Sequence, residues 1–128
     1  MSKIAIVDDA EDTRDFLYFL LKDRHTVVRY SNGAELLAHY RLDAPDLIIL
    51  DVGLEDMDGF AVLAEIRADT SSPQMPIIAV TAHAMAGDRE RCLAAGFDDY
   101  VAKPILDLEA FLNQIERHLK RIHRPGSN

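Results

Sequence analysis

The sequence predicts an α/β protein with one five-stranded parallel sheet and helices on both faces of that sheet. Short apolar runs alternate with stretches of helical period about five times along the chain. The runs are rich in Ile and Val and almost continuously apolar, which is typical of strands covered on both faces. The expected strands are Lys3–Val7, Thr26–Tyr30, Asp46–Leu50, Pro76–Thr81 and Asp99–Ala102.

A segment with helical period follows each expected strand. In the last of these segments apolar residues recur every three or four positions, and Asp107 can cap its start. Turn-forming residues agree with the boundaries: Asn32-Gly33 follows the second strand, Ser71-Ser72-Pro73 closes the third helix and Gly96 follows the fourth. The expected helices are Glu11–Asp23, Ala34–Arg41, Gly59–Ala68, Gly87–Ala95 and Asp107–Ile122.

Composition limits the function classes that remain open. The chain has 128 residues, the size of one domain, and a net charge of −8, which argues against direct binding of nucleic acid. No apolar run approaches the roughly 20 residues of a membrane span, so we expect no membrane insertion. The N-terminal apolar stretch is too short for a secretory signal, and the single cysteine, Cys92, suits a reducing compartment. We therefore expect a cytoplasmic protein.

Four of the expected strands end on residues that phosphoryl-transfer chemistry can use. Asp8 and Asp9 follow the first strand, Asp51 follows the third, Thr81 ends the fourth and Lys103 follows the fifth. The carboxyl ends of parallel strands line the ligand crevice of an open sheet, so we expect these side chains to meet. Aspartate at a strand end is common in turns, and one such residue alone would mean little. Their coincidence at four strand ends is what indicates a site.

Three carboxylates in one place repel one another unless a cation compensates them. One like-charge pair at 4 Å costs about 4 kcal/mol at an effective dielectric constant near 20. Mg²⁺ prefers oxygen ligands and is usually held by one or two carboxylates, so it fits this set. Asp8 and Asp9 come as a pair suited to a metal, which leaves Asp51 as the expected nucleophile and phosphoacceptor. Thr81 and Lys103 are suited to binding phosphate oxygens.

The motifs around these residues resemble the receiver domain of bacterial two-component response regulators, over essentially the whole chain. The resemblance implies a flavodoxin-like sheet in strand order 2-1-3-4-5, with Mg²⁺ as the cofactor. The matching motifs are Ile6-Val7-Asp8-Asp9, the segment 50–59, Val80-Thr81-Ala82 and Tyr100-Val101-Ala102-Lys103-Pro104.

The resemblance also implies roles for individual residues. Asp51 would be the phosphoacceptor, and Asp8, Asp9 and the backbone carbonyl of Gly53 would hold Mg²⁺ together with it. Thr81, the Ala82 amide and Lys103 would contact the phosphoryl group. Thr81 and Tyr100 would form the switch, and the Lys103-Pro104 step of the family is often cis.

Two departures from the family pattern affect the expected site. The family usually has Pro four residues after the acceptor, and here Glu55 stands there. We expect this loop to be more flexible and to carry extra negative charge near the metal. Gly53 and His83 occupy positions through which such domains tune phosphoryl lifetime, and His83 can titrate near neutral pH.

The first expected helix carries more apolar surface than one buried face uses. Tyr18 and Phe19 point away from its apolar stripe, and one interpretation is partial cover by neighbouring helices. The alternative, which the resemblance favours, is that Tyr18 and Phe19 flank a docking face for a kinase together with Pro104 and Ile105. The expected stripe consists of Phe16, Leu17, Leu20 and Leu21.

Other residues receive simpler interpretations. Cys92 is expected to be a small packing residue. The fourth helix has few large apolar residues and is expected to be weakly anchored, and so able to reposition. We expect the histidines outside the motifs to be solvated on the surface, namely His25, His39, His118 and His123.

We expect residues 1–123 to form a single receiver domain and residues 124–128 a short tail with no output domain. Such a domain would not be an enzyme acting on a metabolite. It would take phosphate from a histidine kinase or histidine phosphotransfer protein, and then bind a downstream partner or relay the phosphate. The alternatives are the N-terminal receiver of a longer regulator, an aspartate-nucleophile phosphatase, which needs an acid where Gly53 stands, and a flavodoxin-like FMN binder. The acidic residues that follow the first strand disfavour the FMN binder, since they would repel its phosphate.

Overall fold

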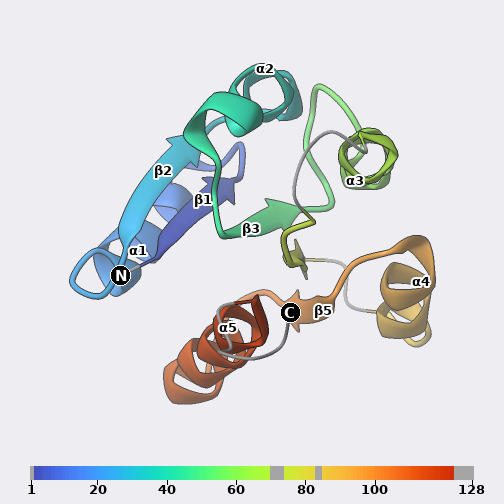
Figure 1. Cartoon of the computed structure of the whole chain (residues 1–128). Coiled ribbons are helices and arrows are strands. Elements are labelled where there is room, and N and C mark those ends of the chain that lie inside the picture. Colours follow the sequence, from blue (N-terminus) through green and yellow to red (C-terminus); the bar gives the residue numbers. More distant parts are fainter. Residues whose placement is uncertain (1, 70–73, 83–84, 123–128) are drawn as a thin grey trace.

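In the computed structural model, which describes residues 2–69, 74–82 and 85–122, strands and helices alternate along the chain (Figure 1). The predicted elements are all present, and their boundaries differ from the predicted ones by at most two residues. The strands are β1 (Lys3–Val7), β2 (Thr26–Tyr30), β3 (Leu47–Asp51), β4 (Ile77–Thr81) and β5 (Asp99–Ala102), and the helices are α1 (Glu11–Leu21), α2 (Gly33–Asp43), α3 (Gly59–Ala68), α4 (Asp88–Ala95) and α5 (Leu108–Ile122).

The five strands form one parallel sheet in the order β2-β1-β3-β4-β5, which confirms the expected topology. The register places Ile6 opposite Ile49, and Ile49 opposite Ile78. The strand order reverses between β1 and β3, so their carboxyl ends open the crevice in which ligands bind in sheets of this kind. Asp8 and Asp51 lie at that point.

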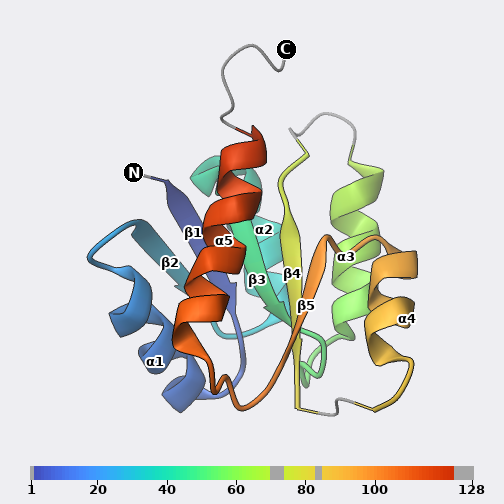
Figure 2. The same ribbon diagram turned by 90° about the horizontal axis from the view of Figure 1, so that it is seen from below.

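Helices cover both faces of the sheet, because successive strand side chains point to opposite faces. Ile4 and Ile6 of β1 pack with α1 and α5, and Ala5 and Val7 pack on the face covered by α2, α3 and α4 (Figure 2). Among the described residues, none of the helices combines the length and apolarity that a membrane span requires.

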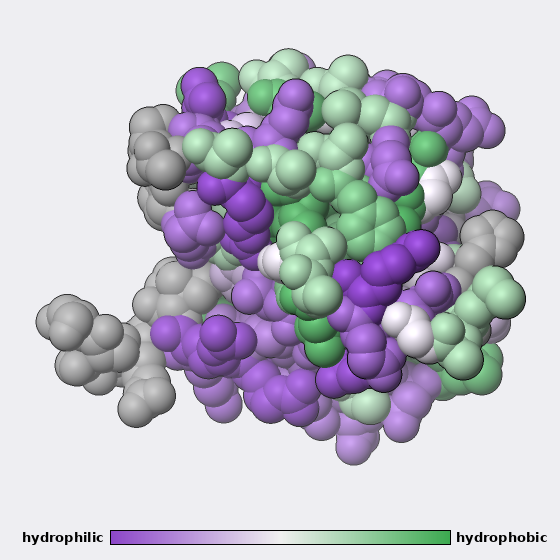
Figure 3. All heavy atoms as spheres, turned by 90° about the vertical axis from the view of Figure 1, so that its right-hand side faces the viewer, coloured by the Kyte–Doolittle hydropathy of each residue, from purple (hydrophilic) through white to green (hydrophobic). Residues whose placement is uncertain are grey.

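The face that carries α3 and α4 has hydrophobic side chains at its centre, which continue toward the upper edge of the view, and hydrophilic ones over much of the rest (Figure 3). The half-buried ring of Phe60 lies 5.6 Å from that of Phe97, and the Arg91 guanidinium lies 5.0 Å from the Phe60 ring centroid. Cys92 is the one buried side chain of α4, as its composition predicted. This helix therefore buries fewer side chains than the other helices do.

The prediction that the histidines are solvated is wrong for His25 and His118, which are both buried. Each has a carboxylate partner: His25 Nε2 lies 2.8 Å from Glu116 Oε2, and His118 Nε2 lies 2.8 Å from Asp99 Oδ2. These partners lower the cost of burying a polar ring. His39 is exposed as expected. The predictions for His83, His123, Ser71-Ser72-Pro73 and the tail 124–128 lie outside the described residues.

Candidate functional site

Three carboxylates meet at the carboxyl ends of β1 and β3. Asp8, Asp9 and Asp51 each offer an oxygen, and these oxygens lie within 4.8 Å of one another. Asp8 and Asp51 are buried, while Asp9 is exposed. The two strands are neighbours in the sheet, so residues 43 positions apart in sequence end at the same edge. The predicted convergence of these side chains is therefore present.

Lys103 reaches this cluster from the segment after β5. Its Nζ donates to Asp8 Oδ2 at 2.7 Å and to Asp51 Oδ2 at 3.3 Å. The backbone amide of Lys103 donates to the Thr81 carbonyl at 2.8 Å, which extends the β4–β5 pairing by one bond and fixes where the side chain starts. The Lys103-Pro104 peptide is cis, as the resemblance implied.

Negative charge exceeds positive charge in this cluster. Among the described residues, Lys103 is the one basic side chain within ion-pair distance of any of the three carboxylates, and it pairs with Asp8 and Asp51. Burial raises the pKa of Asp51 and the Asp8 carboxylate raises it further, while the Gly53 amide and Lys103 act in the opposite direction. Burial alone would lower the pKa of Lys103, but Asp8 and Asp51 outweigh it and the pKa lies above its ordinary value. Lys103 is therefore positively charged at neutral pH.

Backbone amides orient each of the three carboxylates. The Ala10 amide donates to Asp8 Oδ1 at 2.9 Å, and the Gly53 amide donates to Asp51 Oδ1 at 2.9 Å. The Glu55 amide donates to Asp9 Oδ2 at 3.1 Å. Carboxylate oxygens held in place near one another are the donor set that a hard cation such as Mg²⁺ takes, so these residues fit that ion.

The hydroxyl and switch residues lie beside the carboxylates. Thr81 is buried at the end of β4 and Ala82 is exposed. A cavity of about 220 Å³ separates the ends of β3 and β4 from α4, and Thr81 and Gly53 line it together with Cys92. Tyr100 is half-buried on the same side of the sheet, and burial raises the pKa of its phenol.

An apolar groove adjoins the cluster on the side of α1. It has a volume of about 610 Å³, and its lining includes Phe16 of α1 together with Pro104 and Ile105. Sequence reasoning placed Phe16 in the buried stripe, but its side chain is 43 % exposed, whereas Leu17 and Leu21 are buried. Phe16 lies one helical turn after Asp12 and Thr13, which also line the groove.

The predicted docking residues Tyr18 and Phe19 do not line this groove. Tyr18 is half-buried, and the Arg29 guanidinium lies 4.3 Å from its ring centroid. Phe19 is 63 % exposed and makes an edge-to-face contact with Tyr18 at 5.4 Å between ring centroids. The two aromatics thus belong to the surface shared by α1 and β2, where the first interpretation, partial cover by neighbours, describes Tyr18 well.

An acidic crevice with a lysine, at the switch point of a 2-1-3-4-5 sheet, defines the class of protein as a receiver domain. The family model for the response regulator receiver domain matches residues 4–116, and the chain belongs to this family. It is 39 % identical over 107 residues to an uncharacterised 14.6 kDa protein of Leptolyngbya boryana, covering 83 % of this chain and 82 % of that protein. It is 34 % identical over 117 residues to the polar-differentiation response regulator DivK of Brucella anthropi, covering 91 % and 94 %.

Solved structures agree with this assignment. The CheY-like response regulator receiver domain of Methanospirillum hungatei superimposes with a TM-score of 0.86 at 28 % identity, covering 98 % of this chain and 99 % of that chain. The chain spans only part of some relatives. It covers 49 % of the probable transcriptional regulator ycf27 of Porphyra purpurea and 14 % of the histidine-protein kinase BarA of Escherichia coli, to which it is 37 % identical over 131 residues.

Proposed function

We propose that this receiver domain is a phosphoacceptor in a two-component phosphorelay. A phosphohistidine on a histidine kinase or histidine phosphotransfer protein would donate its phosphoryl group to Asp51, in a reaction that depends on Mg²⁺. The observation that carries the proposal is the cluster of three carboxylates whose oxygens lie within 4.8 Å, with Lys103 bonded to two of them.

The residues of the cluster would have separate roles in binding Mg²⁺ and in accepting the phosphoryl group. Asp8, Asp9, Asp51 and the Gly53 carbonyl would hold Mg²⁺, which neutralises charge on the phosphoryl oxygens when bound. A carboxylate oxygen of Asp51 would form the new bond to phosphorus as the bond to the donor imidazole breaks.

Lys103 would move from pairing with two carboxylates to pairing with the phosphoryl group, which also takes contacts from the Thr81 hydroxyl and the Ala82 amide. The domain would then hydrolyse its own aspartyl phosphate slowly. It would not act as an enzyme on a separate metabolite.

Phosphorylation would be read out through α4, β5 and α5. Thr81 lines the cavity beside α4, and α4 is held by one buried side chain, so a small shift of Thr81 toward the phosphate has room to reposition this helix. Tyr100 on β5 would turn with it. The altered surface would then bind a downstream protein or favour onward transfer of phosphate.

The phosphodonor would dock along the groove lined by Phe16, Pro104 and Ile105, because this apolar surface lies directly beside Lys103. We also propose a cytoplasmic location, which suits the single buried Cys92. DivK is named a response regulator, and BarA is a histidine kinase with a matching segment. A stand-alone relay domain and one domain of a longer regulator are both compatible with these relatives.

Intact mass spectrometry tests the proposal. The protein is incubated with acetyl phosphate and Mg²⁺, in parallel with Asp51→Asn and with a sample containing excess chelator. The expected result is an adduct of one phosphoryl group on wild type with Mg²⁺ and none in the other two samples. An adduct of equal yield on Asp51→Asn, or none on wild type, would overturn it.

A further inference from the structure

The loop between β3 and α3 is attached to the start of α2 by a carboxylate that the proposed chemistry does not use. Asp56 Oδ1 accepts a hydrogen bond from the Gly33 amide at 3.0 Å, and Asp56 Oδ2 accepts one from the Ala34 amide at 2.9 Å. We propose that this contact, the Asp56 latch, is a positioning device that sets the Mg²⁺ affinity of the carboxylate cluster. The inference rests on the proposed function.

The start of α2 needs the acceptors that Asp56 supplies. The first amides of a helix have no partner within the helix, and Asn32 caps only one of them here, accepting from the Glu35 amide at 2.8 Å. Asp56 accepts from two more and places a negative charge at the positive end of the helix. The Gly33 amide and, less strongly, the Ala34 amide hold the pKa of Asp56 below its ordinary value, so the carboxylate is ionised at neutral pH.

Packing reinforces the latch. A Cβ atom at Gly33 would lie 2.7 Å from Met57 Cγ and 2.8 Å from Val62 Cγ2, closer than side chains approach each other. Glycine at this position therefore lets the loop lie directly against the first turn of α2. The loop is held by two hydrogen bonds and by a close contact one residue later.

The other end of the same loop holds the carboxylate cluster. The amide of Glu55, the neighbour of Asp56, donates to Asp9 Oδ2 at 3.1 Å, and the amide of Gly53 donates to Asp51 Oδ1 at 2.9 Å. A proline at position 55 has no N–H and could not make the bond to Asp9. In this chain hydrogen bonds therefore join the loop both to the carboxylate cluster and to the start of α2, and the expected flexibility of the loop stays a prediction.

From this connection it follows that Asp56 acts through Gly53 and Glu55. If the latch opens, the Gly53 carbonyl and the Asp9 carboxylate lose their fixed separation. The entropy lost on ordering the loop then makes the binding free energy of the ion less favourable. Asp56 itself is exposed and does not belong to the three carboxylates whose oxygens converge. It is a positioning residue and touches neither the ion nor the phosphoryl group.

Calorimetric titration of the full chain with MgCl₂ tests the inference. Asp56→Ala is compared with wild type and with Glu55→Gln, which removes the same charge from the neighbouring residue but leaves the latch intact. We expect Asp56→Ala to raise the Mg²⁺ dissociation constant about five- to tenfold, the range set by loss of a helix cap. Glu55→Gln should weaken binding less than Asp56→Ala, because it removes an exposed charge near the metal but keeps the latch and the Glu55 amide bond to Asp9.

Two further readouts separate positioning from a general loss of stability. Hydrogen exchange at the Gly33 and Ala34 amides should accelerate in Asp56→Ala. The rate of phosphorylation by acetyl phosphate should fall at low Mg²⁺ and return to the wild-type value at saturating Mg²⁺. A defect that persists at saturating Mg²⁺ would contradict a role in affinity.

Each outcome bears on a distinct claim. Equal dissociation constants for wild type and Asp56→Ala would overturn the inference alone, as would an equal weakening in Glu55→Gln. Absence of Mg²⁺ binding by wild type would overturn the proposed function and the inference together. Where Asp56→Ala does not fold, Asp56→Asn replaces it, since it retains one acceptor oxygen; it should weaken binding about twofold or more, and no weakening would overturn the inference.

Discussion

At the amino ends of the strands, buried polar groups have hydrogen-bond partners within the chain, whereas at the carboxyl ends three carboxylates gather near the ammonium of one lysine. The first set includes the His25–Glu116 and His118–Asp99 contacts, each of 2.8 Å. In the second set, Lys103 contacts Asp8 and Asp51, and burial raises the pKa of Asp51. At the amino ends donors and acceptors are matched, whereas at the carboxyl ends three carboxylates gather around one ammonium.

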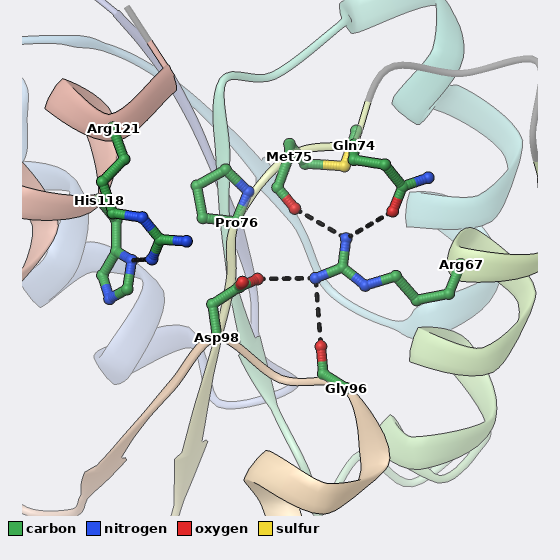
Figure 4. Close-up of a pocket in the computed structure, with 8 residues that line it drawn as sticks. All are labelled: Arg67, Gln74, Met75, Pro76, Gly96, Asp98, His118 and Arg121. Atoms are coloured by element: carbon green, nitrogen blue, oxygen red, sulfur yellow. Dashed lines mark hydrogen bonds and ion pairs between the residues drawn. The ribbon is translucent and has the colours of Figure 1, made fainter. Parts of the chain in front are cut away.

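The amino end also contains a cavity of about 410 Å³ whose polar groups are hydrogen-bonded to one another (Figure 4). The Arg67 guanidinium donates to Asp98 Oδ2 at 2.7 Å, to the Met75 carbonyl at 2.8 Å and to the Gly96 carbonyl at 3.2 Å. The Ile77 amide donates to the same Asp98 oxygen at 2.8 Å. The groups in this cavity are satisfied by one another, and they tie α3 to the segments flanking β4 and β5.

The difference between the two ends separates structural from functional charge. Where donors and acceptors match, the groups stabilise the fold, and a ligand would have to displace existing bonds. Where like charges gather with too little compensation, the fold pays a cost that a cation can remove. This is why we assign function to the cluster of Asp8, Asp9 and Asp51 and not to the cavity around Arg67.

The largest effect is expected at the amino end. Arg67→Ala removes hydrogen bonds to two carbonyls and leaves Asp98 without its guanidinium, so it should lower the free energy of unfolding by about 2–4 kcal/mol. Urea denaturation measures this change. At a temperature where the variant is folded, its phosphorylation by acetyl phosphate should proceed at the wild-type rate. A strong loss of phosphorylation would contradict the claim that the polar groups at the amino ends act on stability alone.

Asp99→Asn should have a smaller effect of the same sign, about 1–2 kcal/mol at pH 7. Burial would raise the pKa of Asp99, but hydrogen bonds from His118, Gln114 and the Tyr100 amide outweigh it and the pKa is lowered. The charged form therefore stabilises the fold above the unfolded-state pKa, and this stability is lost as pH falls through the folded-state pKa. Denaturation at a series of pH values should show the two proteins converging in acid.

Asp51→Asn should act in the opposite direction and stabilise the protein by about 1 kcal/mol at pH 7 without Mg²⁺. The pKa of Asp51 is raised by burial and then by Asp8, so its charge destabilises the fold, and this cost grows as pH rises from the unfolded-state pKa through the folded-state pKa. Thermal unfolding measures the gain. Mg²⁺ should raise the melting temperature of wild type more than that of Asp51→Asn. A less stable Asp51→Asn in the absence of Mg²⁺ would contradict the charge imbalance.

The smallest expected effect concerns apolar groups at the carboxyl end. Phe16→Ala should slow phosphotransfer from a phosphorylated histidine phosphotransfer protein about threefold, since Phe16 lines the groove beside Lys103. Phosphorylation by acetyl phosphate, which needs no docking surface, should be unchanged. Phe19→Ala is the matched control, because Phe19 is exposed but does not line the groove. Equal slowing in both variants would remove the groove from the docking surface.

Much of the fold and the central site could be predicted from the sequence, because both depend on local patterns. The strands read as apolar runs, and parallel strands bring the residues after them to one edge, so Asp8, Asp51 and Lys103 could be placed together. The resemblance supplied the strand order. The residues that sequence reasoning missed depend on tertiary neighbours. The buried His25 contacts Glu116, which lies 91 residues away in sequence. Asp56 accepts a hydrogen bond from the Gly33 amide, 23 residues away.

Phe16 shows a related limit. Helical period assigned it to the same stripe as Leu17 and Leu21, which are buried, but the stripe does not say how far along the helix the covering elements extend. Phe16 lies beside the segment containing Pro104 and Ile105, so it lines a groove and is not part of the core.

The excess negative charge at the carboxyl end can be tested most directly by calorimetric titration of wild type, Asp8→Asn and Asp99→Asn with Mg²⁺. We predict that wild type binds one ion, that Asp8→Asn binds at least about tenfold more weakly, and that Asp99→Asn, which removes a buried aspartate at the amino ends of the strands, binds as wild type does. Wild-type protein that binds no Mg²⁺, or an Asp8→Asn variant that binds it equally well, would contradict the account.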